Sequence, residues 1–280
     1  MPEKLLLLDF DGTLCLGDAP VLAYAEQVDR MLAEEGLPVL EAGGIRGAVV
    51  RGLAQDRLLI PEVRLDEAGH PRGVDSEPVR SSGRKDFGGT GRAHPVSWPL
   101  QDGYQLVQLL ARQAGLTDEQ AGMAFRAARK ELLARGLSAT DVQAPAGAHE
   151  LIAAVRERAA VVLATNSPAE AFAPWLEHLG LGDAFDAVIN DAAKPFGMPA
   201  VLETARQAAG AEAPTEEDIL SVGDIWRNDL EHVAARGGTT VLIDRFRTGL
   251  GQPDRRVYDF SGAAEAVAQW AGVPVPVNIR

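Results

Sequence analysis

The chain has 280 residues, of which 46% are hydrophobic, a net charge of −13 and a single cysteine, Cys15. The length fits one large domain or two smaller ones, with enough apolar residues for a sizeable core. The acidic charge argues against nucleic acid or an anionic membrane as a partner, and one cysteine excludes an intrachain disulfide. No apolar run approaches the ~20 residues of a membrane span. We therefore expect a cytoplasmic protein, monomeric or homodimeric.

The first predicted element is a buried strand at residues 5–8, where four leucines follow one another. Asp9 and Asp11 come directly after it, and Gly12 allows the backbone to bend sharply. Unpaired charges are costly inside a sheet, so two acids at this point indicate a site that binds a metal and a phosphate. The plainer alternative is a strand that runs into a polar Asp-Gly turn.

The segment after this strand predicts an inserted domain at residues 17–145, because roughly 150 residues are far too many for a crossover loop. Apolar residues at helical spacing predict helices at 20–35, 104–114 and 117–135. The last of these begins at a capping-box pattern formed by Thr117 and Gln120. Residues 41–99 are rich in Gly, Arg, Asp and Pro, and we expect them to be irregular and a candidate lid, apart from a strand at 58–65.

The second half of the chain alternates between strand and helix. Short apolar runs predict buried strands at 161–164, 187–189, 219–222 and 240–243. Helices are predicted between them at 168–179, with Ser167 as its N-cap, and at 199–209 and 230–235. This alternation is typical of an α/β fold with a parallel sheet covered by helices on both faces. Residues 1–16 and 146–272 would form this domain, followed by an extended tail at 273–280.

Polar residues suited to phosphate chemistry follow the predicted strands: Asp9, Asp11, Thr165, Asn166, Lys194, Asp224 and Asp229. Ligands bind at the carboxyl ends of the strands in an open parallel sheet, so we expect these residues to share one rim. Four carboxylates repel one another and need a counter-ion. Mg²⁺ is the expected one, because it takes oxygen ligands and bridges carboxylates to phosphate.

The pattern assigns a chemical role to each residue. Asp9 can attack phosphorus and form an aspartyl-phosphate, while Asp11 can protonate the leaving oxygen and later accept a proton from water. Thr165 and Lys194, with Asn166 beside them, can hold the phosphoryl oxygens. Singly, each residue has an ordinary structural explanation, such as a helix cap or a solvated lysine. Their occurrence in this order at successive strand ends favours a site for phosphoryl transfer.

These motifs together resemble those of the haloacid dehalogenase superfamily of hydrolases. The matching segments are D-x-D-G-T-L at 9–14, T-N at 165–166, K-P at 194–195 and G-D-x-x-x-x-D at 223–229. The resemblance implies a Rossmann-like sheet, an inserted and mainly helical cap domain, and Mg²⁺-dependent phosphoryl transfer through Asp9. It also implies that the metal is bound by Asp9, the backbone carbonyl of Asp11, and Asp224, with Asp229 as a ligand or a neighbouring partner.

The presence of Asp11 separates the possible reactions, because the dehalogenases of this superfamily lack the second acid of the first motif. We therefore predict a Mg²⁺-dependent phosphatase acting on a small phosphorylated metabolite. A phosphomutase that uses the same intermediate is the alternative. A non-catalytic phosphate-binding module and a dehalogenase are favoured less.

Overall fold

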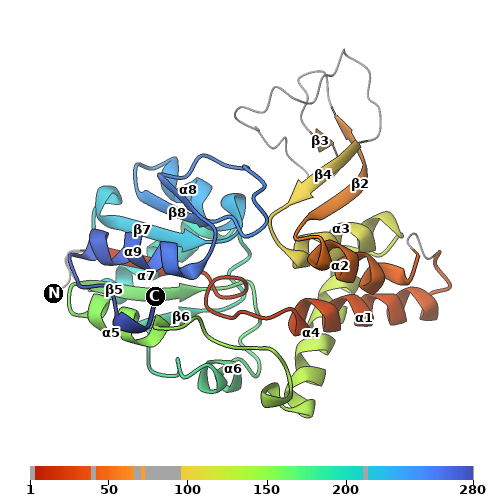
Figure 1. The fold of residues 1–280 in the computed structure, drawn as a ribbon, viewed down its shortest axis with the longest axis horizontal. Coiled ribbons are helices and arrows are strands. Elements are labelled where there is room, and N and C mark those ends of the chain that lie inside the picture. The colour runs from red at the N-terminus through yellow and green to blue at the C-terminus, as the bar shows by residue number, and fades with distance from the viewer. Residues whose placement is uncertain (1–3, 39–41, 66–70, 73–95, 211–213, 280) are drawn as a thin grey trace. The chain divides into compact units, whose positions relative to one another are not determined.

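The computed structural model describes residues 4–38, 42–65, 71–72, 96–210 and 214–279 (Figure 1). The chain divides into two compact units. The first comprises Met1–Asp18, Arg135–Arg247 and Gln252–Arg280, and the second comprises Ala19–Ala134 and Thr248–Gly251. Residues 135–145, expected from the sequence in the inserted domain, group instead with the first unit.

The first unit is built on a six-stranded parallel sheet with the order β6-β5-β1-β7-β8-β9. The strands are β1 (Lys4–Leu8), β5 (Ala159–Ala164), β6 (Ala187–Ile189), β7 (Ile219–Gly223), β8 (Thr239–Ile243) and β9 (Arg255–Val257). The first five confirm the predicted strands. β9 was not predicted, because its Arg-Arg-Val sequence is not an apolar run. As an edge strand it has one neighbouring strand and is less buried, so it does not need an apolar sequence.

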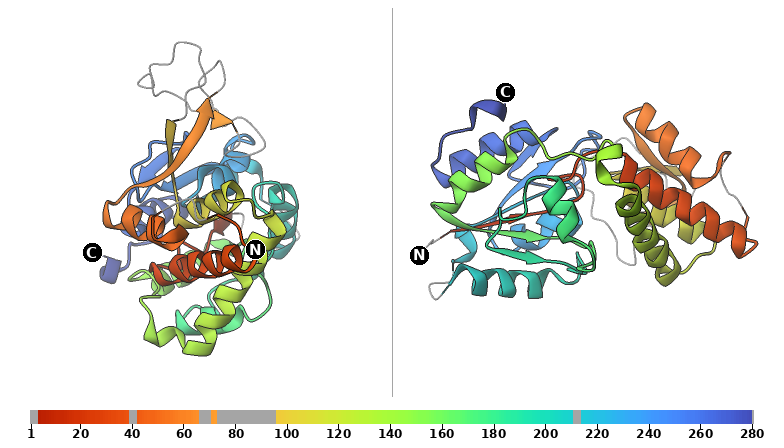
Figure 2. Two further views of the ribbon diagram at one scale, coloured as in Figure 1. Left: turned by 90° about the vertical axis from the view of Figure 1, so that its right-hand side faces the viewer. Right: turned by 90° about the horizontal axis from the view of Figure 1, so that it is seen from below.

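Helices cover both faces of this sheet, as predicted (Figure 2). One face packs on α7 (Met198–Ala209) and α8 (Glu231–Ala234), and the other on α5 (Ala148–Arg156) and α9 (Phe260–Ala271). Leu5 and Leu7 of β1 belong to the core beneath α7. Leu6 and Leu8 are also buried and alternate to the opposite face. A strand covered on both faces explains the unbroken run of leucines.

The structure corrects the sequence around residue 168. The helix expected at 168–179 begins only at α6 (Ala173–His178), and Phe172 occupies its N-cap position. Ser167 is therefore not a helix cap. The tail expected to be extended forms a 3-10 turn at Val277–Ile279, in which Ile279 is buried. A further 3-10 turn, Leu137–Ala139, follows the second unit.

The second unit contains four helices and a small antiparallel sheet within the described part of the chain. Its elements are α1 (Ala19–Glu34), α2 (Gly44–Ala54), α3 (Gly103–Gln113), α4 (Asp118–Arg135), β2 (Leu58–Leu65), β3 (Pro71–Arg72) and β4 (Val96–Leu100). Helices α1, α3 and α4 and strand β2 confirm the predicted elements. The capping box before α4 is formed, since the Gln120 backbone N–H donates to Thr117 Oγ1 at 3.2 Å and Gln120 Oε1 accepts from the Thr117 N–H at 2.9 Å.

The expectation of an irregular 41–99 is wrong at α2 and β4, and residues 66–70 and 73–95 lie outside the described part. The three glycines of α2 give it a weak helix propensity. Tertiary contacts compensate: the carboxylate of Asp29 in α1 accepts from the backbone N–H groups of Ile45 and Arg46 at 2.8 and 3.0 Å. Ile45 and Val49 are buried, so packing stabilises this helix where its sequence does not.

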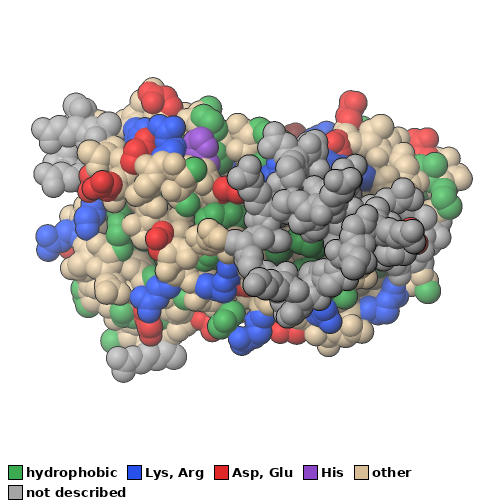
Figure 3. Space-filling model, turned by 90° about the horizontal axis from the view of Figure 1, so that it is seen from above, with side chains coloured by type: hydrophobic (Ala, Val, Ile, Leu, Met, Phe, Trp, Pro, Cys, Tyr) green, Lys and Arg blue, Asp and Glu red, His purple; other side chains and the backbone are tan. Residues whose placement is uncertain are grey.

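Charges of both signs occur together on one face of the protein, although the chain as a whole is acidic. On the face shown in Figure 3, Lys and Arg side chains are interspersed with Asp and Glu among the described residues. None of the helices in the described ranges is both long enough and apolar enough to cross a membrane.

A carboxylate that forms ion pairs with two arginines gives a testable prediction about stability. Glu216, in the 3-10 turn Glu216–Asp218, contacts Arg206 and Arg236, each at 2.8 Å. Hydrogen bonding from Arg236, and then from Arg206, lowers the pKa of Glu216. The stability it contributes is therefore present above its unfolded pKa and is lost as the pH falls through its folded pKa.

We expect Glu216→Gln to lower the free energy of unfolding by about 1 kcal/mol at pH 7. The difference from wild type should be smaller at pH 3 than at pH 7, because the stability that Glu216 contributes is lost as the pH falls through its folded pKa. Urea denaturation at both pH values measures this, with the exposed neighbour Glu217→Gln as the matched control. An equal loss at both pH values would contradict the electrostatic explanation.

Candidate active site

The candidate site lies at the carboxyl ends of three adjacent strands, β5, β1 and β7. Asp9 directly follows β1, Thr165 follows β5 and Asp224 follows β7. The Asp9 N–H donates to Val222 O at 3.0 Å and the Thr165 N–H to Ile189 O at 2.9 Å, so hydrogen bonding between neighbouring chain segments continues past the strand ends. The functional side chains therefore stand on rigid backbone, as a preorganised site requires.

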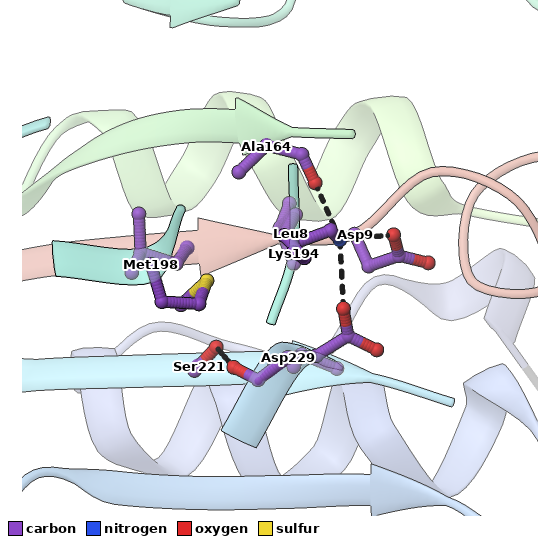
Figure 4. A pocket seen from close by; sticks show the side chains of 9 residues that line it. Leu8, Asp9, Ala164, Lys194, Met198, Ser221 and Asp229 are labelled. Atoms are coloured by element: carbon purple, nitrogen blue, oxygen red, sulfur yellow. Dashed lines mark hydrogen bonds and ion pairs between the residues drawn. The ribbon is translucent and has the colours of Figure 1, made fainter. Parts of the chain in front are cut away.

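Lys194 occupies the centre of the site (Figure 4). Its Nζ donates to Asp9 Oδ1 at 2.7 Å, to Asp229 Oδ1 at 2.7 Å and to the Ala164 carbonyl at 2.8 Å. These three acceptors match the three hydrogens of an ammonium group. Burial alone would lower the pKa of Lys194, but the carboxylates of Asp229 and Asp9 outweigh it and raise that pKa. With 3% of its side chain exposed, Lys194 is not a solvated surface lysine.

Asn166 fixes the backbone that carries Lys194. Its Oδ1 accepts from the Lys194 N–H at 2.7 Å, and its Nδ2 donates to the Lys194 carbonyl at 3.0 Å. Both the oxygen and the nitrogen of the amide thus bond to the backbone of Lys194. This fixes the position from which the Lys194 side chain extends. Contact between Asn166 and a phosphate stays a prediction.

Asp9 is held from two sides and is largely buried. Besides the Lys194 contact at Oδ1, its Oδ2 accepts from Thr13 Oγ1 at 3.0 Å, and 10% of the side chain is exposed. Burial raises the pKa of Asp9 to about 7, against the opposing effect of Lys194 and with a further increase from Asp229. One lysine is therefore not enough to keep this carboxyl group fully ionised at neutral pH.

Three carboxylates converge beside Lys194. One oxygen from each of Asp9, Asp224 and Asp229 lies within 4.8 Å of the others. Two glycines make this approach possible: a Cβ at Gly12 would lie 2.0 Å from Asp224 Oδ2, and one at Gly223 would lie 2.4 Å from Asp229 Oδ2. Gly12 also has φ +86°, which favours glycine.

The donor set fits a hard divalent cation. Three acids and one ammonium leave an excess of negative charge, and all the available ligand atoms are oxygens. Asp229 is further oriented by the Ile225 N–H, which donates to its Oδ2 at 3.0 Å, and by Ser221 Oγ, which donates to its carbonyl at 2.7 Å. Asp229 lies in a π-helical turn, Trp226–Leu230, which begins two residues after Asp224.

Asp11 does not belong to this carboxylate cluster through its side chain. Its Oδ2 instead accepts a hydrogen bond from Ser167 Oγ at 2.7 Å. Thr165 is buried, and its Oγ1 accepts from the Ser167 N–H at 3.0 Å. Two partners were not predicted from the sequence: Thr13 for Asp9 and Ser167 for Asp11. Thr13 could have been found from its place within the first motif, whereas the Ser167 contact depends on tertiary structure.

A pocket lies at this position and is lined mostly by apolar residues (Figure 4). Its lining residues are Leu7, Leu8, Asp9, Ala164, Lys194, Met198, Ser221, Val222 and Asp229. The apolar members come from the strands and from α7, whereas Asp9 and Lys194 come from loops and Asp229 comes from the π-helical turn. Such low-dielectric surroundings strengthen the interactions among the charged groups.

Comparisons with known proteins identify the family of the chain. A family model described as haloacid dehalogenase-like hydrolase matches residues 3–235. No curated protein matches the sequence.

Among solved structures, a HAD hydrolase of family IA, variant 3, from Entamoeba histolytica matches at TM-score 0.55 and 15% identity, over 96% of this chain and 99% of that one. A predicted phosphoglycolate phosphatase from Haemophilus somnus matches at TM-score 0.53 and 15% identity, over 95% and 99%. The putative HAD-hydrolase YfnB from Bacillus subtilis, bound to magnesium, matches at TM-score 0.51 and 15% identity, over 98% and 100%. At these identities the structures establish the fold, and the family model establishes that the chain belongs to the haloacid dehalogenase-like hydrolases.

Proposed function

We propose that this hydrolase is a Mg²⁺-dependent phosphatase that acts on a small phosphorylated metabolite through an aspartyl-phosphate on Asp9. The observation that carries the proposal is the buried contact of Asp9 with Lys194, beside Asp224 and Asp229. A nucleophilic carboxylate, an ammonium group and a cluster of oxygen ligands are the parts that phosphoryl transfer requires.

In the first half-reaction, a carboxylate oxygen of Asp9 attacks phosphorus, and the bond from phosphorus to the leaving oxygen breaks. Asp11, in its acid form, gives its proton to that oxygen, so the alcohol leaves neutral. Lys194 and Thr165 stabilise the charge that builds on the other phosphoryl oxygens, and Asn166 keeps the lysine in place.

In the second half-reaction, Asp11 is a carboxylate and accepts a proton from water. The water oxygen attacks phosphorus, and the bond between phosphorus and Asp9 breaks. Inorganic phosphate leaves, and both aspartates return to their starting states. The sum is one phosphate ester and one water converted to one alcohol and one phosphate.

Asp9, Asp224, Asp229 and the backbone carbonyl of Asp11 would hold the metal. When bound, Mg²⁺ neutralises charge on the phosphoryl oxygens and favours the ionised form of Asp9. The all-oxygen donor set supports this assignment, as does the magnesium bound by the putative HAD-hydrolase of B. subtilis.

Asp11 also favours phosphatase over dehalogenase chemistry. A halide leaves without being protonated, so carbon–halogen cleavage has no use for a second acid two residues after the nucleophile. The hydroxyl group of Ser167 donates a hydrogen bond to Asp11, which supports a catalytic role for Asp11. A phosphomutase would use the same first half-reaction but return the phosphoryl group to its substrate.

Metal removal and product analysis test the proposal together. We expect phosphate release equal to the substrate consumed for at least one member of a panel of phosphorylated metabolites. EDTA should lower kcat/KM by about 100-fold or more, and Mg²⁺ should restore it.

Three outcomes would contradict this expectation. Activity indifferent to both EDTA and Mg²⁺ would remove the metal. An isomeric phosphate ester formed without free phosphate would identify a mutase. Halide released from a 2-haloacid, with no phosphate released from any ester, would identify a dehalogenase.

A further inference from the structure

The hydroxyl group of Ser167 contacts Asp11, the acid and base of the proposed reaction. Ser167 Oγ donates to Asp11 Oδ2 at 2.7 Å, although the two residues lie 156 positions apart in the chain. Ser167 is 1% exposed. The contact therefore joins the loop after β5 to the loop after β1, between the buried hydroxyl group of Ser167 and the half-buried carboxyl group of Asp11.

The backbone of Ser167 is fixed independently of this contact. Its N–H donates to Thr165 Oγ1 at 3.0 Å, and its carbonyl accepts from the Asp191 N–H at 3.0 Å and from Asn190 Nδ2 at 3.2 Å. The residue is thus anchored on both sides of its Cα. Its short side chain has one rotatable bond to the hydroxyl group, so little freedom remains once the backbone is set.

A helix-capping role does not explain the hydroxyl group. A capping serine would bond to a backbone N–H two or three residues ahead, but α6 begins at Ala173 with Phe172 at its N-cap. The turns at 168–172 displace the helix start from Ser167 and leave its side chain for Asp11.

We propose that Ser167 is a positioning residue that orients the carboxyl group of Asp11 for proton transfer to the leaving oxygen. This inference rests on the proposed phosphatase function. The bond keeps Oδ2 of Asp11 as an acceptor in both protonation states, so the transferred proton is carried on Oδ1. Fixing the carboxyl group in one orientation removes a rotation that would otherwise oppose the transfer.

The leaving group separates this role from a general structural one. A nitrophenolate leaves without a proton, whereas the alkoxide of an alkyl phosphate needs one. We expect Ser167→Ala to lower kcat/KM for an alkyl phosphate by about 10- to 100-fold. For p-nitrophenyl phosphate the loss should be under about 3-fold, because the proton from Asp11 contributes little there. The ratio kcat/KM is the right quantity, since it reports the steps up to the first irreversible one, transfer to Asp9.

Two further variants sharpen the measurement. Ser221→Ala is the matched control, because its buried hydroxyl contacts the Asp229 carbonyl and not Asp11, so both substrates should change by the same factor. Ser167→Thr keeps a hydroxyl group and should recover activity on the alkyl phosphate. Should Ser167→Ala fail to fold, Ser167→Cys fills the same space with a weaker donor and still allows the comparison.

An equal loss on both substrates, or no loss on the alkyl phosphate, would overturn the positioning role. This failure differs from failure of the proposed function. If wild type hydrolyses both esters and Asp9→Asn hydrolyses neither, the phosphatase assignment stands whatever Ser167→Ala does. If wild type hydrolyses no phosphate ester, the proposed function fails and the positioning role fails with it.

Discussion

Replacing Asp9 by Asn should abolish phosphate release from an aryl phosphate, with kcat lowered by about 10⁴-fold or more. The amide has nearly the shape of the carboxylate but is a far weaker nucleophile, so the aspartyl-phosphate cannot form. A continuous assay of released phosphate measures the loss. Circular dichroism and thermal unfolding check that the fold persists.

A matched variant separates chemistry from structure. Asp186→Asn also removes one carboxylate charge, but Asp186 lies at the opposite end of the strands, where it accepts from the Val161 N–H at 2.8 Å and contacts Arg156 at 2.7 Å. It should lose stability and keep activity. Residual activity of more than a few per cent in Asp9→Asn would show that another group attacks phosphorus.

In the absence of metal, Asp9→Asn should also change how the stability of the protein depends on pH. The pKa of Asp9 is raised to about 7 by burial, above its value in the unfolded chain. The folded protein therefore holds this proton more tightly, and its stability falls as the pH rises from about 4 to about 7. Asn has no such ionisation. In EDTA, the unfolding temperature of Asp9→Asn relative to wild type should rise across this range and level off above it.

Replacing Lys194 by Met should damage both activity and stability. Met keeps most of the apolar stem but leaves Asp9 and Asp229 as neighbouring buried carboxylates without their shared cation. Removing one partner of a buried ion pair costs about 3–5 kcal/mol, and we expect a loss of this size at pH 8 in EDTA. Phosphate release should fall by about 10³-fold or more, because the variant lacks the positive charge that we propose stabilises the phosphoryl oxygens.

Chemical denaturation of Lys194→Met at pH 5 and pH 8 tests the cause. The stability loss should be smaller at pH 5, where Asp9 is protonated and less charge is left uncompensated. Lys194→Arg serves as the control: it keeps the positive charge and should recover part of the stability. Its planar guanidinium cannot reproduce the three contacts of Nζ, so activity should stay low. A stability loss that is equal at both pH values would point to packing instead.

Local patterns were enough to predict most of the sheet and the residues at its edge. A strand buried on both faces must be apolar throughout, so the runs at 5–8, 161–164 and 219–222 stand out from the polar residues that end them. The carboxyl ends of parallel strands share one edge, which is why acids far apart in sequence were expected together. The burial of Lys194 between Asp9 and Asp229 agrees with that expectation.

Other features depend on contacts that no local pattern encodes. Helix α2 has a glycine-rich sequence, and its first turn is capped by Asp29 of α1. The side chain of Asn166 suits a phosphate, yet it bonds to the Lys194 backbone. Ser167 reads as a helix cap, yet the chain turns before α6 begins.

The sequence by itself determined five of the six strands of the parallel sheet, the chemical identity of the edge residues and the family, because strand burial and motif spacing are local properties. Only the tertiary structure decided which atoms meet: Lys194 with two carboxylates and a carbonyl, and Ser167 with Asp11. Hydrogen bonds form over about 3 Å. Their partners are therefore chosen by how loops from different strands pack against one another, which residue spacing along the chain does not specify.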